Sequence, residues 1–299
     1  MTGFLGIDHP LIAFRDLTQA VERYSALGFQ LTPVGKHPWG TSTVLAMFDR
    51  CALELMGVYD ESLIDEKPIG DFRFGRTVRD QLAEREGITL LALYSNNAEG
   101  DAAAVQARGV TCQGSVEFGR DVVLPDGRKD RTKTTLKILQ SPDLPRLSNF
   151  ACQQHRPELI YVPGWLEHPN KAFGISRVTI LAERSDHGRV RQRLAGLYDE
   201  DALFESADGF GARTGNGDFI VVDRKAASEC YGNIPAAFST SEPCYVGIDV
   251  RVPDVATVMP FIEAANMKYR RGEGSVLLTD AGYFGNVFLS FVSSKRMNG

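Results

Sequence analysis

One pattern recurs four times along this chain and constrains its fold more than any other feature. Each copy opens on a Gly-Ile pair before a strand-like segment, continues into a helical segment and closes on another strand. The four pairs begin at Gly6, Gly87, Gly174 and Gly247. An internal repeat sets the architecture, because each copy is one structural unit that buries its apolar face against the next. The repeat therefore predicts an α+β fold built from four βαβββ modules.

The first copy shows this unit most clearly. Residues 5–14 have the pattern of a strand, and Asp16 can cap a helix that runs to Leu27, with Gly28 as its C-terminal stop. Three further strand-like segments follow, over residues 29–34, 43–48 and 52–58. The other copies predict helices over 98–108, 188–197 and 255–265 and closing strands over 148–154, 219–223 and 287–292.

Residues 156–172 separate the second copy from the third. Three prolines interrupt this stretch, so it does not favour a regular helix or strand. We therefore expect two domains, an N-terminal module pair over residues 1–157 and a C-terminal pair over 173–299, joined by an ordered linker over 158–172.

Composition excludes several classes of function. The 299 residues are 43% hydrophobic and 24% charged, with a net charge of -5, so the chain lacks the basic surface that nucleic-acid binding requires. No apolar run is long enough to span a bilayer, and the first residues do not have the pattern of a signal peptide. The five cysteines are widely spaced and form no Cys-x-x-Cys pair. We expect a reduced, cytoplasmic protein that acts on a small molecule.

Two ionisable residues stand inside apolar strand segments of the first copy. His9 lies in the opening strand and Glu54 in the closing one. A charged group inside such a strand is costly unless another group pairs with it or binds it. An imidazole and a carboxylate together suggest a shared metal ion. The alternatives are a core or turn histidine before Pro10, and a Glu54 carboxylate paired with Arg15 or Arg177.

The first module resembles the vicinal oxygen chelate superfamily, most closely its glyoxalase-like branch, and the resemblance extends to about residue 172. The matching segments are Asp8-His9, Asp16-Leu17, 27–29, 37–41, 53–55, 150–157 and 168–170. The resemblance implies that paired modules form open, cupped β-barrels around one divalent metal ion. It also implies self-association as a homodimer. Four modules in one chain is the layout of extradiol dioxygenases, which place the metal in the C-terminal pair. Here Arg177 and Val250 replace the expected ligands there, so we predict the metal site in the N-terminal pair.

A metal ion that acts on a substrate usually takes three protein ligands. At the position that corresponds to His9, the second copy has Leu90, which cannot bind a metal. Its closing strand offers Gln153 and His155, which lie on the same face under period-two alternation. We predict His9, Glu54 and His155 as the ligands, with Gln153 as an alternative or as a group that orients a ligand. A surface position at the strand end is the alternative for His155.

Other polar residues are candidates for contacting the substrate. His37, Trp39 and Thr41 belong to a Gly-containing loop between strands, which is a usual place for substrate contacts, although a plain hairpin connection has the same pattern. His168, near Asn170 in the linker, is a candidate acid or base, and a simple turn is its alternative.

Two imidazoles and one carboxylate leave coordination positions open for a substrate with neighbouring oxygens. With Fe2+ one position remains for dioxygen, and this favours a dioxygenase that acts on a small, possibly aromatic substrate. With Zn2+, Mn2+, Ni2+ or Co2+ the same site would be a Lewis acid for a glyoxalase-like lyase or isomerase. A third alternative is a protein that binds a small molecule without turning it over.

Overall fold

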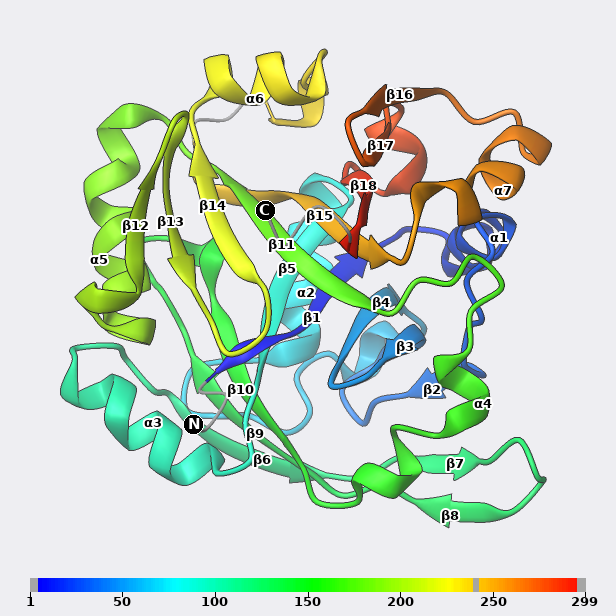
Figure 1. Cartoon of the computed structure of the whole chain (residues 1–299). Coiled ribbons are helices and arrows are strands. Elements are labelled where there is room, and N and C mark those ends of the chain that lie inside the picture. The colour runs from blue at the N-terminus through cyan, green and yellow to red at the C-terminus, as the bar shows by residue number, and fades with distance from the viewer. Residues whose placement is uncertain (1–4, 239–241, 295–299) are drawn as a thin grey trace.

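The computed structural model describes residues 5–238 and 242–294. These residues form two eight-stranded sheets, one in each half of the chain (Figure 1). Residues 1–4, 239–241 and 295–299, which include the outer ends of both expected domains, lie outside the described residues. No helix in the described part is long and apolar enough to cross a membrane.

The N-terminal sheet has the strand order β2-β3-β4-β1-β5-β10-β9-β6, and a separate hairpin, β7–β8, lies outside it. Its strands are β1 (Gly6–Ala13), β2 (Gly35–Lys36), β3 (Thr41–Phe48), β4 (Cys51–Val58), β5 (Gly87–Tyr94), β6 (Gly114–Phe118), β9 (Thr134–Leu139) and β10 (Asn149–Gln154). The hairpin consists of β7 (Asp121–Val123) and β8 (Lys129–Arg131).

The C-terminal sheet repeats this arrangement in the order β12-β13-β14-β11-β15-β18-β17-β16. Its strands are β11 (Gly174–Leu181), β12 (Leu203–Ser206), β13 (Gly209–Arg213), β14 (Asp218–Val222), β15 (Cys244–Val252), β16 (Tyr269–Gly272), β17 (Ser275–Leu278) and β18 (Phe288–Ser293). The α-helices are α1 (Leu17–Ala26), α2 (Phe74–Glu84), α3 (Ala98–Ala107), α4 (Pro163–Leu166), α5 (His187–Tyr198), α6 (Arg224–Tyr231) and α7 (Met259–Ala264).

The four predicted βαβββ modules are confirmed. In each half the two modules meet where their first strands pair antiparallel, β1 with β5 and β11 with β15. Each first strand also pairs parallel with the last strand of its own module, as β1 does with β4. The two sheets curl into half-barrels, which is the cupped fold expected from the resemblance.

Two local predictions need correction. Residues 29–34 are not a strand. The ladder with β3 is limited to Gly35 and Lys36, and before it a single backbone bond joins Thr32 to the Leu45 carbonyl, while Phe29 packs against Phe48 and Phe291. The helix expected over 255–265 is split into a 3-10 turn and α7, which begins at Met259 with Pro260 in its first turn. Proline lacks the N–H that a continuous helix would need at that point.

The two faces of each sheet have different neighbours. One face packs against helices and against the other half of the chain, forming a large core that includes Ile7, Leu93, Ile180 and Leu289. The opposite face of the N-terminal sheet is concave and carries a second apolar cluster. This concave face, with the groups that cover it, is called the N-terminal cup below.

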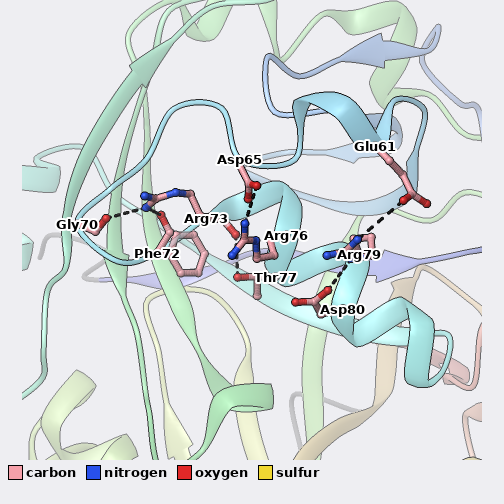
Figure 2. A network of polar contacts seen from close by, with 9 residues as sticks. All are labelled: Glu61, Asp65, Gly70, Phe72, Arg73, Arg76, Thr77, Arg79 and Asp80. Carbon is pink, nitrogen blue, oxygen red and sulfur yellow. Dashed lines mark hydrogen bonds and ion pairs between the residues drawn. The ribbon is translucent and has the colours of Figure 1, made fainter.

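Helix α2 covers part of the N-terminal cup, and the repeat did not predict it. Its buried residues Phe74, Val78 and Leu82 join the apolar cluster of the cup. On its outer side, Arg76 pairs with Asp65 at 2.6 Å and other arginines contact the preceding segment (Figure 2). The helix therefore has an apolar side against the cup and a charged side toward solvent.

The corresponding face of the C-terminal sheet carries an apolar cluster of its own. In the sequence, helix α6 stands between β14 and β15, as α2 stands between β4 and β5. It contributes Ala226 and Ala227 to this apolar cluster. The Tyr231 ring stacks on Phe288 at 4.4 Å. Arg177, which stands where the first module has His9, pairs with Asp249 at 3.7 Å.

Candidate functional site

A cavity of about 190 Å3 opens into the N-terminal cup. The inward side chains of β1, β4, β9 and β10 form its floor, and the loop over residues 32–39 forms one wall. The β7–β8 hairpin and residues 159–165 of the linker cover its mouth; Figure 1 shows this hairpin next to α4, away from the main sheets. The strands of the sheet therefore form the floor of the site, and the long connections between them enclose it.

His9 and Glu54 meet inside this cavity, as the sequence predicted. The Nε2 atom of His9 lies 3.3 Å from Oε2 of Glu54, although this contact does not have hydrogen-bond geometry. The Nδ1 atom of His9 is hydrogen-bonded to Oδ1 of Asp8 at 2.9 Å. Thr43 on β3 donates a hydrogen bond of 2.5 Å to Oε1 of Glu54. The His9 imidazole thus lies between the carboxylates of Asp8 and Glu54, and the hydrogen bond from Thr43 holds the Glu54 carboxylate in place.

The charges of the cup shift the pKa of its histidines in opposite directions. Burial lowers the pKa of His9, but the carboxylates of Asp8 and Glu54 outweigh it, so the net shift is upward from 6.5. Burial lowers the pKa of His37 well below 6.5, and the positive Arg120 and His9 lower it further. His37 is therefore the neutral histidine of the cup, and His9 the one that holds a proton more readily.

The predicted substrate-contact loop lies on the wall of the cavity. The His37 ring stacks on the Trp39 ring at 5.1 Å, and both side chains line the cavity. Thr41 lies behind them, fully buried, and shares a hydrogen bond of 2.9 Å with Nδ1 of His37. Thr41 therefore orients His37 and is not itself part of the cavity lining.

The third predicted ligand lies elsewhere. The His155 side chain is exposed, and its Nε2 is hydrogen-bonded to Thr135 at 2.8 Å. Gln153 accepts a hydrogen bond from the Ala98 N–H at the start of α3 and donates one to the Asn96 carbonyl. Their inward-facing neighbours, Cys152 and Gln154, line the cavity instead. The structure does not bring His9, Glu54 and His155 together.

His168 is buried outside the cavity lining. Its Nδ1 accepts a hydrogen bond from the Gln30 N–H at 2.9 Å, and its Nε2 donates one to the Met47 carbonyl at 2.7 Å. Burial lowers the pKa of His168, and the Met47 carbonyl opposes this shift. Both ring nitrogens are therefore engaged in fastening the linker to the edge of the cup.

Three further cavity residues did not emerge from the sequence. Arg120, at the base of the β7–β8 hairpin, extends its side chain into the cavity, and Cys152 and Gln154 face inward from β10. Burial raises the pKa of the Cys152 thiol well above 9.0, with Asp8 and Glu54 adding to the shift. The one signal for Arg120 is its place directly after the strand-like segment 116–118, where loop residues that contact ligands are common.

Most of the chain matches a known family model. The family model described as "Glyoxalase-like domain" matches residues 7–198, which is more than half of the chain. The chain belongs to the glyoxalase-like domain family. The matched segment contains the whole N-terminal cup, including the linker residues at its mouth. No functionally curated protein matches the sequence as a relative.

Solved structures share the fold over nearly the whole glyoxalase-like chain. A hypothetical protein from Staphylococcus aureus is 14% identical, with a TM-score of 0.68 over 97% of this chain and 100% of that one. A mutant of 4-hydroxymandelate synthase from Streptomyces coelicolor is 8% identical, with a TM-score of 0.59 over 98% and 93%. Homoprotocatechuate 2,3-dioxygenase from Arthrobacter globiformis is 13% identical, with a TM-score of 0.52 over 98% and 81%. At these identities the likeness is one of fold.

Proposed function

We propose that this glyoxalase-like protein is an enzyme that acts on a small molecule in the N-terminal cup, with His9 as the residue that moves a proton. The observation that carries the proposal is the position of the His9 imidazole between Asp8 and Glu54 at the cavity. A carboxylate on Nδ1 fixes the ring and stabilises its protonated form. Nε2, which lies 3.3 Å from Glu54 Oε2 without a hydrogen bond to it, is the ring nitrogen available to the reacting group. This arrangement suits an isomerase or lyase.

The proton step uses only residues of the cup. Neutral His9 would take a proton from a substrate C–H next to a carbonyl group at Nε2, and the electron pair of that bond would move to the carbonyl oxygen. Asp8 would stabilise the imidazolium through the hydrogen bond to Nδ1. Return of the proton to the opposite face of the same carbon would give the epimer. Transfer of the proton to a leaving group on the next carbon, as the bond to that group breaks and the enolate electrons form the new double bond, would give the lyase product.

A metal-dependent dioxygenase is the second candidate. Its support is the convergence of His9 and Glu54 at 3.3 Å and the dioxygenase among the proteins of similar fold. The donor set does not fit the predicted triad: His155 is exposed, and the described residues contain no cluster of three His, Cys, Asp or Glu side chains that could hold a metal ion. We therefore derive no step through a metal ion.

One experiment separates the two candidates. Purified protein is incubated in D2O with a panel of small α-keto and α-hydroxy carboxylates, and carbon-bound proton exchange is followed by NMR before and after treatment with a chelator. Proton transfer by His9 predicts exchange that survives chelation and falls by roughly 10² to 10⁴ in His9→Gln, the range typical of general acid–base catalysis.

The matched variant is His155→Gln. If His9 acts alone, this substitution outside the cup leaves exchange unchanged. Activity that is lost on chelation, returns with Fe2+ and oxygen, and disappears in His155→Gln would reject the first candidate in favour of the dioxygenase. Homodimerisation and a cytoplasmic location stay predictions.

A further inference from the structure

Arg120 is held at the base of the β7–β8 hairpin by its backbone. Its N–H donates to Thr132 Oγ1 at 2.9 Å, and its carbonyl accepts from the Thr132 N–H at 2.9 Å. These two bonds close the hairpin where it leaves the N-terminal sheet. The side chain is half-buried and lines the cavity, while the next arginines of the hairpin point to solvent. Its backbone fixes where the guanidinium enters the cup.

The guanidinium of Arg120 has no hydrogen bond or ion pair with any described residue, whereas the other arginines in and near the hairpin do. Arg128, Arg131 and Arg156 each pair with an aspartate. Glu54 attracts the guanidinium across the cup, but no contact within ion-pair distance joins them. An arginine stays charged and carries five N–H donors. A guanidinium that is partly removed from water and has no partner is costly, and a bound anion would lower this cost.

Gly35 leaves the space that this guanidinium occupies. A Cβ atom at position 35 would lie 2.5 Å from Nη1 of Arg120, so any larger residue would displace the head group. The backbone at Gly35 is not in the left-handed region, so turn geometry does not require a glycine there. The absence of a side chain therefore serves the placement of Arg120.

The rest of the cavity lining is largely apolar and aromatic, and Phe150 contacts the His9 ring edge-to-face at 5.9 Å. Phe74, Phe118 and Phe150 line it, together with Trp39, whose indole N–H has no hydrogen-bond partner among the described residues. A volume of about 190 Å3 is below the roughly 300 to 1,000 Å3 of pockets for drug-sized ligands. The cavity therefore suits a single aromatic ring with a short substituent.

We propose that Arg120 binds the carboxylate of a small aromatic monocarboxylic acid. This inference rests on the proposed function and specifies its substrate class. The flat guanidinium can hold a carboxylate through two parallel hydrogen bonds. The phenylalanines of the cup pack against the ring. A phosphate or dicarboxylate fits less well, because the cavity is already lined by the carboxylates of Asp8 and Glu54, which would repel a dianion more strongly than a monoanion.

Calorimetric titration with phenylacetate and phenylacetamide tests this assignment, because the two probes share a shape and differ in charge. The wild type should bind phenylacetate about ten- to hundredfold more tightly than phenylacetamide, the difference expected for hydrogen bonds to a charged group. Arg120→Gln should bind both probes alike. Gly35→Ala, which keeps the charge but displaces the guanidinium, should weaken phenylacetate selectively.

Arg128→Gln is the matched control, since this exposed arginine lies in the same hairpin and pairs with Asp126. It should keep the preference for phenylacetate. The assignment is overturned if the wild type binds neither probe at millimolar concentration, if it binds both equally, or if Arg120→Gln keeps the preference. Turnover of uncharged substrates that depends on His9 but not on Arg120 would overturn this inference and leave the proposed function standing. Selective binding of phenylacetate without any proton exchange would overturn the proposed function and leave the assignment of Arg120 standing.

Discussion

At the scale of single residues, Glu54 is stabilised in the cup by groups from three separate elements. Thr43 donates to it from β3, His9 approaches it from β1, and Arg120 attracts it from the base of the hairpin. The sequence predicted the first-strand histidine, because an ionisable group in an apolar strand needs a partner. It did not predict Arg120, because the polar residues around it have the composition of a solvated hairpin.

A largely buried carboxylate in the C-terminal half, Asp249, gives a test of pH dependence. Burial raises the pKa of Asp249, and attraction by Arg177 and a hydrogen bond from Ser290 only partly oppose it. The folded chain therefore holds this proton more tightly than the unfolded chain, and the stability this provides is present below about pH 3.8 and is lost as the pH rises through the raised pKa. Asp249→Asn should thus be more stable than the wild type at pH 7, with the difference shrinking toward pH 4.

Urea unfolding at a series of pH values measures this difference. Exposed Asp49→Asn serves as the control and should follow the wild type at every pH. A lower urea midpoint for Asp249→Asn at pH 7 would show that its pairing with Arg177 outweighs the cost of burial.

At the scale of elements, strand β10 shows what alternation can and cannot determine. Gln153 and His155 do share a face, as predicted, but it is the face away from the cup. The alternation of side chains along a strand determines which residues share a face. Only a contrast between an apolar and a polar face shows which of the two faces turns inward. Residues 149–152 are all buried, so β10 has no such contrast. The order of the modules was predictable, and the orientation of this strand was not.

The start of α2 provides a prediction of its own. Replacing a helical glycine by alanine usually stabilises a protein by roughly 0.5 to 1 kcal/mol. At Gly75, however, a Cβ atom would lie 2.2 Å from the Trp39 carbonyl and 2.8 Å from the Ile64 backbone. Gly75→Ala should therefore destabilise the protein and disturb Trp39 at the cavity wall.

Urea unfolding and tryptophan fluorescence check this outcome. Gly188→Ala is the matched control, because Gly188 lies near the start of α5 and a Cβ atom there would meet nothing within 4 Å. The control should show the usual stabilisation. Equal gains in both variants would mean that α2 can move away from Trp39 without cost.

At the scale of the whole molecule, the two halves each have a sheet but share the core between them. The repeat and the proline-containing linker predicted two module pairs, but neither predicts how the pairs pack. Tyr198 of α5 donates a hydrogen bond to the Leu5 carbonyl at 2.8 Å, and Phe29 stacks on Phe291 at 5.9 Å. Contacts so distant in the sequence leave no periodic pattern, so only the structure shows them.

This shared core predicts that the halves unfold together, and Arg193 tests the prediction. From α5 it reaches across to the Leu139 carbonyl and to Asn149 of the N-terminal sheet, and burial lowers its pKa to about 10. Arg193→Leu should cost about 1 to 3 kcal/mol, because it leaves buried acceptors without a donor. Arg191→Leu on the same helix, where a half-buried arginine pairs with Glu205 and lies over the Phe210 ring, should cost less than about 1 kcal/mol.

In hydrogen exchange, Arg193→Leu should lower protection in both sheets by the same factor, because one cooperative unit opens as a whole. Loss of protection confined to the C-terminal sheet would show instead that the halves fold as independent domains.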